Sequence, residues 1–164
     1  MNRNVILATL CYVRKDRQTL MLYRNKKKND IHEGKWNGLG GKFLPGESPE
    51  ECVIREVKEE SGLSLQEPYL RGHITFPEFD GVNDWNVFIF TTYNYKGSLI
   101  DSHEGELEWI NDERILQLNL WPGDRIFLKW LYNEDNNFFS AKFCYEAGKL
   151  VDHKVNFYPY KSEK

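Results

Sequence analysis

The sequence is poor in cysteine, and its three cysteines lie far apart. Cys11, Cys52 and Cys144 form no CxxC pair. An odd, dispersed set of this kind argues against a disulfide framework and against a zinc site. Free thiols are typical of a reducing compartment, so we expect a cytoplasmic protein.

Long apolar runs are also lacking. No segment approaches the roughly 20 apolar residues that a membrane-spanning helix needs, and we therefore expect no membrane partner. The apolar run at residues 5–13 is short, is followed at once by the charged residues RKDR, and has no small-residue cleavage site. These features predict a strand rather than a signal peptide.

Positive charge is not in excess. The 22 lysines and arginines are outnumbered by 25 aspartates and glutamates, which gives a net charge of -3. This balance argues against stable nucleic-acid binding, but it allows a small phosphorylated substrate whose charge is neutralised by metal ions or by a local basic cluster. There is no internal repeat and no low-complexity segment. The 164 residues, 40% apolar and 15% aromatic, predict a single folded domain spanning 1–164.

Alternating and β-branched residues predict several strands, and helical spacing predicts two or three helices. The predicted strands are 5–13, 19–24, a short segment near 36–39, 71–79, 86–97 and 107–110. The predicted helices are 49–61, a short one that begins at 111 or 112 and reaches 116–118, and 123–134. Residues 138–158 predict a C-terminal β-hairpin that turns at 146–148. This mixture favours an α/β or α+β sandwich around a mixed sheet.

One predicted helix carries an unusual concentration of negative charge, in the stretch REVKEESG (55–62). Its start is marked by a capping box, with Ser48 at the N-cap and Glu51 three residues later, and by Pro49 at the first helical position. Gly62 ends it. At about 100° per residue, three apolar residues share the arc expected to face the core: Val53, Ile54 and Val57. A neighbouring arc holds three carboxylates: Glu56, Glu59 and Glu60.

These carboxylates repel one another, and Glu60 is expected to lie closest to the core. Glu56 and Glu60 are a like-charge i,i+4 pair, which is unfavourable even in water. Arg55 is placed to reach Glu59 at i,i+4. Mg²⁺ takes oxygen ligands and shares phosphate oxygens with a substrate, so it would offset the remaining repulsion between the carboxylates. The alternative, an acidic helix face exposed to solvent, stays open at this point.

The longer stretch GKFLPGESPEECVIREVKEESGL (41–63) resembles the signature of the Nudix hydrolases without a departure. This resemblance implies an α/β/α sandwich that splits a nucleoside diphosphate linked to another group, using Mg²⁺ or Mn²⁺. It implies a metal site whose ligands are Glu56, Glu59, Glu60 and the carbonyl of Gly40, with Glu56 or a nearby glutamate as the base. It also implies that Arg55 orients the glutamates and that a late glutamate contacts metal or water. Glu104 matches that late position, and Glu106 is close enough to be the true equivalent.

Further segments resemble the MutT-type members that hydrolyse oxidised purine nucleoside triphosphates: WNGLGGK (36–42), ITFPEF (74–79), LWPGDRIF (120–127) and the KF pair near Phe143. The resemblance implies that Asn37 reads the purine edge, that Trp121 stacks on the base and that Asp124 hydrogen-bonds it. It also implies that two further residues line the pocket: Phe76 and Ile31. Gly123 is a departure, because the animal enzyme carries a second aspartate there.

Each of these residues also has an ordinary structural interpretation. Trp121 is able to fill the core, Asn37 to occupy a turn, and Asp124 to cap a helix that begins at 125. The basic residues at 24–28 are interpreted as a solvated loop, in which Arg24 is the best candidate for a phosphate contact; Lys42, in the signature loop, is another. The four histidines are scattered, and none is assigned a catalytic role.

The sequence therefore predicts Mg²⁺-dependent hydrolysis of a purine nucleoside triphosphate such as 8-oxo-dGTP to monophosphate and pyrophosphate, by a monomer or homodimer. Two alternatives remain. One is a Nudix hydrolase for another substrate, such as a dinucleoside polyphosphate, a nucleotide sugar or an RNA 5′ end. The other is a regulatory module of the same fold without catalysis, which the retention of all signature glutamates disfavours.

Overall fold

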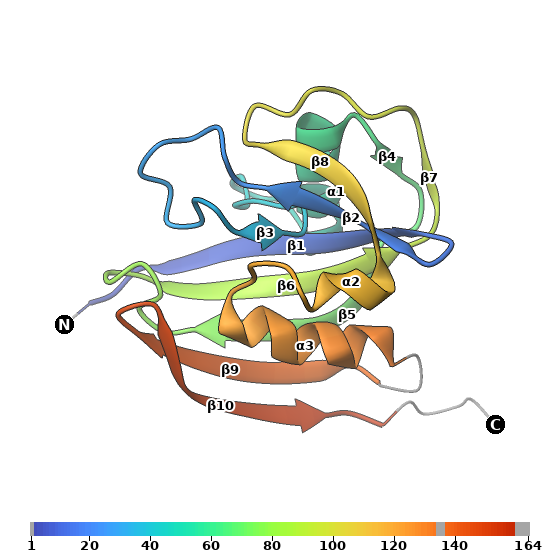
Figure 1. Ribbon diagram of the computed structural model, residues 1–164. Coiled ribbons are helices and arrows are strands. Elements are labelled where there is room, and N and C mark those ends of the chain that lie inside the picture. Colours follow the sequence, from blue (N-terminus) through green and yellow to red (C-terminus); the bar gives the residue numbers. More distant parts are fainter. Residues whose placement is uncertain (1, 134–136, 160–164) are drawn as a thin grey trace.

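A large mixed sheet lies between helices in the computed structural model, which describes residues 2–133 and 137–159 (Figure 1). The strands are β1 (Val5–Lys15), β2 (Gln18–Tyr23), β3 (Trp36–Asn37), β4 (Ser64–Leu65), β5 (Tyr69–Phe76), β6 (Asp84–Thr92), β7 (Tyr95–Lys96), β8 (Glu106–Asn111), β9 (Phe139–Glu146) and β10 (Lys149–Phe157). The helices are α1 (Pro49–Ser61), α2 (Asp112–Ile115) and α3 (Pro122–Tyr132). The predicted mixed α+β architecture is confirmed, including the C-terminal hairpin.

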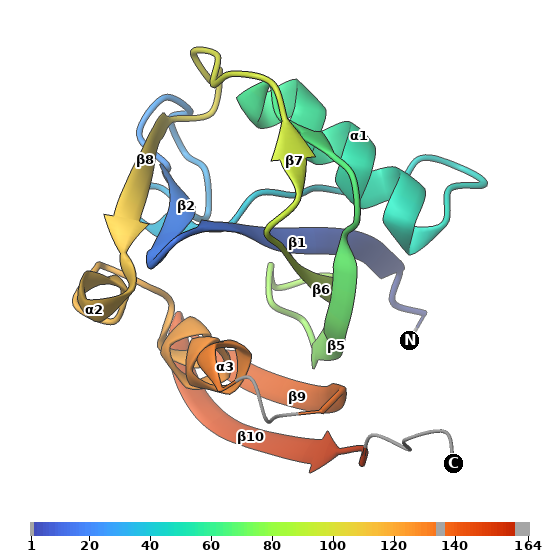
Figure 2. The ribbon, with the colours of Figure 1, turned by 90° about the vertical axis from the view of Figure 1, so that its right-hand side faces the viewer.

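The large sheet has the strand order β10-β9-β5-β6-β1-β2-β3, and β8, which is off this path, pairs with β2 along its whole length. β1 runs parallel to β6, and β5 runs parallel to β9, while the remaining pairs are antiparallel. Figure 2 shows α1 on one side of the sheet, with α2 and α3 on the other. In the described part of the chain, no helix is both long enough and apolar enough to cross a membrane.

The alternation of side chains along the strands builds a core on each face of the sheet. Cys11, Val13 and Phe90 pack with Val53 and Val57 of α1. On the other face, the core includes side chains from β1, β2, β6 and α3: Tyr12, Met21, Ile89, Phe127, Leu128 and Leu131. β1 and β6 are therefore buried on both faces and form a rigid centre for the loops at their ends.

Helix α1 has the predicted limits because its ends are specified locally. The Ser48 hydroxyl accepts a hydrogen bond from the Glu51 N–H, and the Glu51 carboxylate accepts one from the Ser48 N–H, both at 3.1 Å. Gly62 has φ 82° and donates its N–H to the carbonyl of Lys58. A Cβ at Gly62 would also lie 2.7 Å from the carbonyl oxygen of Ser98, so glycine is required for conformation and for space.

Several predicted details are wrong. Ile54 was expected to face the core, but it is 38% exposed. Cys52 is buried on α1 together with Val53 and Val57. The predicted strand 86–97 is two strands, β6 and β7, and β7 pairs with β4 in a separate small sheet that was not predicted. β5 ends at Phe76 rather than at residue 79. The last helix starts at Pro122, one residue early, and the predicted final residue 134 lies outside the described ranges.

Candidate active site

A pocket of about 580 Å³ opens where the loops after β2 and β5 meet β1, α1 and the first turn of α3. Ten of the residues singled out from the sequence line it, although they are spread over a hundred positions. They are Arg24, Ile31, Asn37, Gly40, Lys42, Glu56, Phe76, Glu104, Trp121 and Asp124. The three other predicted site residues, Arg55, Glu59 and Glu60, lie on α1 and are not among the residues that line the pocket.

The segment Leu39–Gly41 brings the loop before α1 against β1. The Thr9 N–H donates to the Gly41 carbonyl at 2.9 Å. A Cβ at Gly40 would lie 1.9 Å from the Thr9 carbonyl oxygen, and one at Gly41 would lie 2.5 Å from the Glu56 carboxylate. The two glycines therefore allow the loop to pass between β1 and the carboxylates of α1.

Arg55 organises the carboxylates, but its main partner was not predicted. Its Nε and Nη2 donate to both oxygens of Glu47, at 2.7 and 2.8 Å, and its Nη1 donates to Glu56 at 2.8 Å. The expected contact with Glu59 is longer, at 3.3 Å, and the Glu59 side chain is 59% exposed. The Arg55 guanidinium, with help from the Leu44 N–H, lowers the pKa of Glu47 to about 2. Arg55 also donates to the Lys42 carbonyl at 3.0 Å, so it ties the loop to the helix.

Replacement of Arg55 by lysine is expected to loosen this arrangement without removing the charge. Lysine has no planar fork to bind Glu47 and Glu56 together. We expect a loss of about 1–2 kcal/mol in the free energy of unfolding and a decrease of about tenfold in kcat/KM. Urea titration and steady-state kinetics measure the two effects. Arg114→Lys, at an exposed position of α2, is the control, and equal kinetics for both variants would contradict the assigned role.

Glu60 is the most deeply buried of the α1 carboxylates, as predicted, with 7% of the residue exposed. It accepts a hydrogen bond from the Gly40 N–H at 3.4 Å. Burial, and then the negative charges of Glu104 and Glu56, raise the pKa of Glu60 well above its ordinary value. Glu104 lines the pocket, whereas Glu106 is exposed on β8, and this placement favours Glu104 as the late glutamate.

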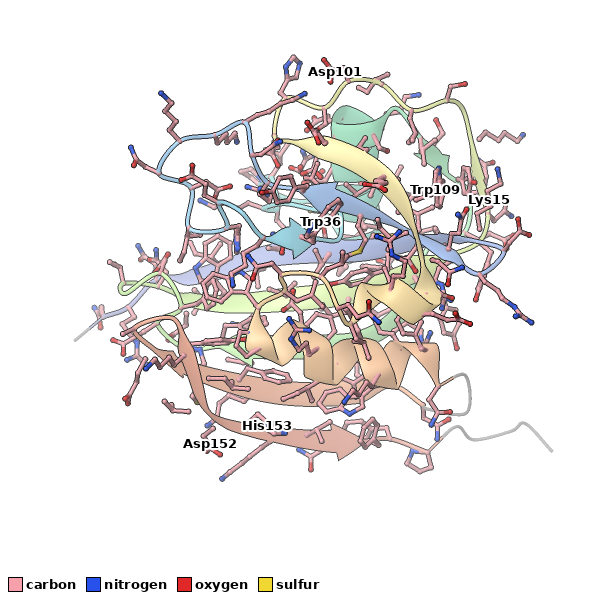
Figure 3. The ribbon with its side chains drawn as sticks, viewed as in Figure 1. Lys15, Trp36, Asp101, Trp109, Asp152 and His153 are labelled. Carbon is pink, nitrogen blue, oxygen red and sulfur yellow. The ribbon has the colours of Figure 1, made fainter. Side chains whose placement is uncertain are left out.

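The basic side chains of the loop after β2 hold Glu104. Arg24 and Lys27 lie 3.2 and 2.9 Å from its two oxygens, and Arg24 also pairs with Asp30. Lys26 instead donates to Asp101, which Figure 3 labels in the loop between β7 and β8. The loop after β2, which was predicted to be solvated, is thus partly held in place by ion pairs.

The carboxylates fit a divalent cation by their chemistry. Glu60 is buried near Glu56 and Glu104, and their mutual repulsion is what a cation with oxygen ligands would offset. Within residues 2–133 and 137–159, no three His, Cys, Asp or Glu side chains stand close enough together to hold a metal ion as they are. Arg55 holds Glu56, and Arg24 and Lys27 hold Glu104, so cation binding would require these pairs to rearrange.

A second set of pocket residues is suited to a flat organic group. Asn37 is buried on β3, so the interpretation as a turn residue is wrong. Trp121 is half-buried in the pocket wall, and the ammonium of Lys35 lies 5.1 Å from the centre of its ring. Asp124 is the third residue of α3, whose N-cap is Trp121, so the N-cap interpretation of Asp124 is also wrong. Burial raises the pKa of Asp124 to about 7, against the opposing effect of Lys35.

Four other aromatic residues of the pocket were not selected from any sequence pattern: His32, Phe79, Trp85 and Tyr145. The Trp121 Nε1–H donates to His32 Nδ1 at 2.8 Å. Burial lowers the pKa of His32 to about 4, so its ring stays neutral and keeps accepting this bond at neutral pH. His32 and Trp121 are 89 positions apart, and no local pattern signals their contact.

Most of the chain matches a known protein family. The NUDIX domain family matches residues 5–131, a range that includes the loop, α1 and its glutamates. The chain belongs to the Nudix family. It is an enzyme of that family, a pyrophosphohydrolase, and Nudix hydrolases generally use divalent metal ions.

Relatives of this Nudix enzyme include the uncharacterised Nudix hydrolase YvcI of Bacillus subtilis, 35% identical over 128 residues that cover 76% of this chain and 77% of the relative. The oxidized purine nucleoside triphosphate hydrolase of Mus musculus is 34% identical over 139 residues, which cover 84% and 83% of the two chains. The crystal structure of a MutT protein from Bacillus halodurans matches with a TM-score of 0.82 and 29% identity, over 92% of this chain and 97% of the other.

Proposed function

We propose that this Nudix enzyme hydrolyses oxidised purine nucleoside triphosphates, such as 8-oxo-dGTP, to the monophosphate and pyrophosphate. Mg²⁺ is the proposed cofactor, and Mn²⁺ is a possible substitute. The observation that carries the proposal is the presence of Asn37, Trp121 and buried Asp124 in the same pocket as Glu56 and Glu104. One cavity thus combines a wall suited to a purine with a cluster suited to metal-bound phosphates.

In this proposal the glutamates and the basic side chains act on the triphosphate. Glu56, Glu59, Glu60, Glu104 and the Gly40 carbonyl would hold the cation, which neutralises phosphate charge and makes a bound water more acidic. Lys42 and Arg24 line the pocket and would contact phosphate oxygens. Water adds to a phosphorus atom, the bond to the leaving phosphate oxygen breaks, and a nearby glutamate accepts the water proton.

The purine would bind against Trp121, with Phe76 and Ile31 closing the pocket around it. Aromatic stacking provides affinity without choosing among bases. The Asn37 amide and the Asp124 carboxyl then provide selection, because a base that leaves a buried polar group unpaired is penalised. The NH₂ and C=O of asparagine match a donor and an acceptor on one purine edge.

The proposed setting is the cytoplasmic nucleotide pool, where removal of an oxidised triphosphate prevents its incorporation into DNA. The three cysteines are free, which fits a reducing compartment. The mouse relative, named for its action on oxidized purine nucleoside triphosphates, supports the same substrate class.

A panel of nucleotides assayed with Mg²⁺ tests the proposal. We expect kcat/KM for 8-oxo-dGTP to exceed that for dGTP and dATP by at least about tenfold, with release of pyrophosphate rather than phosphate. The panel includes a dinucleoside tetraphosphate and a nucleotide sugar as competing substrates. Turnover of 8-oxo-dGTP no better than that of dGTP and dATP would exclude the sanitising role.

A further inference from the structure

The hydroxyl group of Tyr145 stands at the point where β9 meets the first turn of α3. Tyr145 lines the pocket, and its hydroxyl oxygen accepts a hydrogen bond from the Gly123 N–H at 2.7 Å. This N–H belongs to the first turn of α3, where backbone donors have no partner inside the helix. The position of the oxygen is therefore set by backbone, not by a mobile side chain.

The ring of Tyr145 is held as firmly as its oxygen. It meets the rings of Trp121 and Phe79 edge to face, with centroid distances of 5.7 and 5.2 Å. Both of these neighbours line the same pocket. A flat group stacked in this aromatic wall would therefore meet the Tyr145 hydroxyl in a fixed place.

The hydroxyl retains a proton that it can donate. A phenol oxygen that accepts one hydrogen bond still has its O–H to give. Burial and the negative charge of Asp124 raise the pKa of Tyr145, so the group stays protonated throughout the physiological range. Asp124 and Tyr145 both line the pocket. Asp124 provides a carboxyl group there, and Tyr145 provides a hydroxyl donor.

Gly123 and Tyr145 depend on each other. A Cβ at position 123 would lie 2.6 Å from the Tyr145 hydroxyl oxygen and 2.9 Å from a ring carbon of Phe143. No side chain fits at 123 while Tyr145 keeps its place. This close approach explains the glycine at 123, and it places a polar group from β9 beside Asp124.

We propose that Tyr145 is a specificity-determining residue, whose hydroxyl donates a hydrogen bond to an acceptor on the edge of the bound base. The inference rests on the proposed function, because it needs a purine in this pocket. A donor at this place favours purines that present a carbonyl oxygen at position 6 over those that present an amino group, because two donors facing each other leave both unpaired.

Tyr145→Phe tests this by removing one oxygen atom and keeping the ring. Binding of dGMP, dIMP and dAMP is measured by calorimetry, and kcat/KM is measured for the matching triphosphates and 8-oxo-dGTP. We expect the variant to lose about tenfold in affinity and kcat/KM for the 6-oxo bases and to stay within about twofold for adenine. Gly123→Ala, which displaces the hydroxyl, is expected to reproduce the same loss of selectivity.

Tyr132→Phe is the matched control. Tyr132 also lies on a partly buried face, and its hydroxyl shares a hydrogen bond with Thr19 at 3.0 Å, but it does not line the pocket. Urea unfolding gives the stability cost of each lost hydroxyl. If Tyr145→Phe lowers stability as Tyr132→Phe does and weakens all bases equally, Tyr145 is only structural and the inference is wrong.

The experiment separates this inference from the proposed function. Wild-type enzyme that prefers 6-oxo nucleotides, and loses the preference in Tyr145→Phe, supports the role of Tyr145 even when 8-oxo-dGTP is a poor substrate. That result would overturn the sanitising role alone. Wild-type enzyme that neither binds these monophosphates nor hydrolyses any of the triphosphates, 8-oxo-dGTP included, would overturn both.

Discussion

Glu60→Gln is expected to lower kcat about a thousandfold while leaving the folded protein at least as stable. The amide still accepts the hydrogen bond from the Gly40 N–H but is a far weaker cation ligand than a carboxylate. A loss of about 4 kcal/mol in transition-state stabilisation corresponds to this factor. Without divalent cations, the variant no longer buries a carboxylate near Glu56 and Glu104, so we expect its free energy of unfolding to be equal or higher.

Thermal unfolding with and without Mg²⁺ provides a readout besides activity. Mg²⁺ should raise the Tm of the wild type, because a ligand that binds only the folded state stabilises it, and the rise should shrink in Glu60→Gln and Glu56→Gln. Glu50→Gln, an exposed position in the first turn of the same helix, is the control and should keep both activity and the Mg²⁺ response. Normal turnover in Glu60→Gln would overturn the metal assignment.

Asp124→Asn is expected to flatten the pH dependence of stability. The folded-state pKa of Asp124 is about 7, against an ordinary value of 3.8, because the carboxyl is buried. The folded protein therefore binds this proton more tightly than the unfolded chain, and the wild type loses stability as pH rises from about 4 to about 7. Each pKa unit corresponds to about 1.4 kcal/mol, so the total reaches a few kcal/mol.

Urea titrations at pH 5 and pH 8 measure this effect. Asp124→Asn should gain more stability relative to wild type at pH 8 than at pH 5, while kcat/KM for purine triphosphates falls. Asp152→Asn, at an exposed position of β10 labelled in Figure 3, should follow the wild type at both pH values. A stability difference between Asp124→Asn and wild type that is the same at both pH values would show that Asp124 does not titrate in this range.

The parts of the structure that could be predicted are those encoded by neighbouring residues. The capping box at Ser48 and Glu51, Pro49 and Gly62 all act within one turn of α1, and both ends of the helix were predicted correctly. The spacing of Glu56 and Glu60 likewise placed Glu60 toward the core. In each case the physical cause lies within about four positions along the chain.

The features that were missed depend on distant parts of the chain. Ile54 has the apolar character of a core residue, but the sheet leaves its arc uncovered, and only tertiary packing decides this. Glu47 became the main partner of Arg55 because the signature loop folds back on the helix. Tyr145 lies in the pocket because β9 pairs in parallel with β5. No sequence pattern within either strand specifies this pairing.

The position of β9 near the edge of the sheet has an evolutionary consequence. The three glutamates of α1 that are proposed to bind the cation lie on a helix packed against β1, whereas Tyr145 is carried by a hairpin that joins the sheet only through β5. Substitutions at the pocket-facing position 145 of the hairpin can therefore change the contacts to a base without touching the proposed cation ligands. A new choice of base can therefore arise in the C-terminal hairpin while the sequence of α1 stays unchanged.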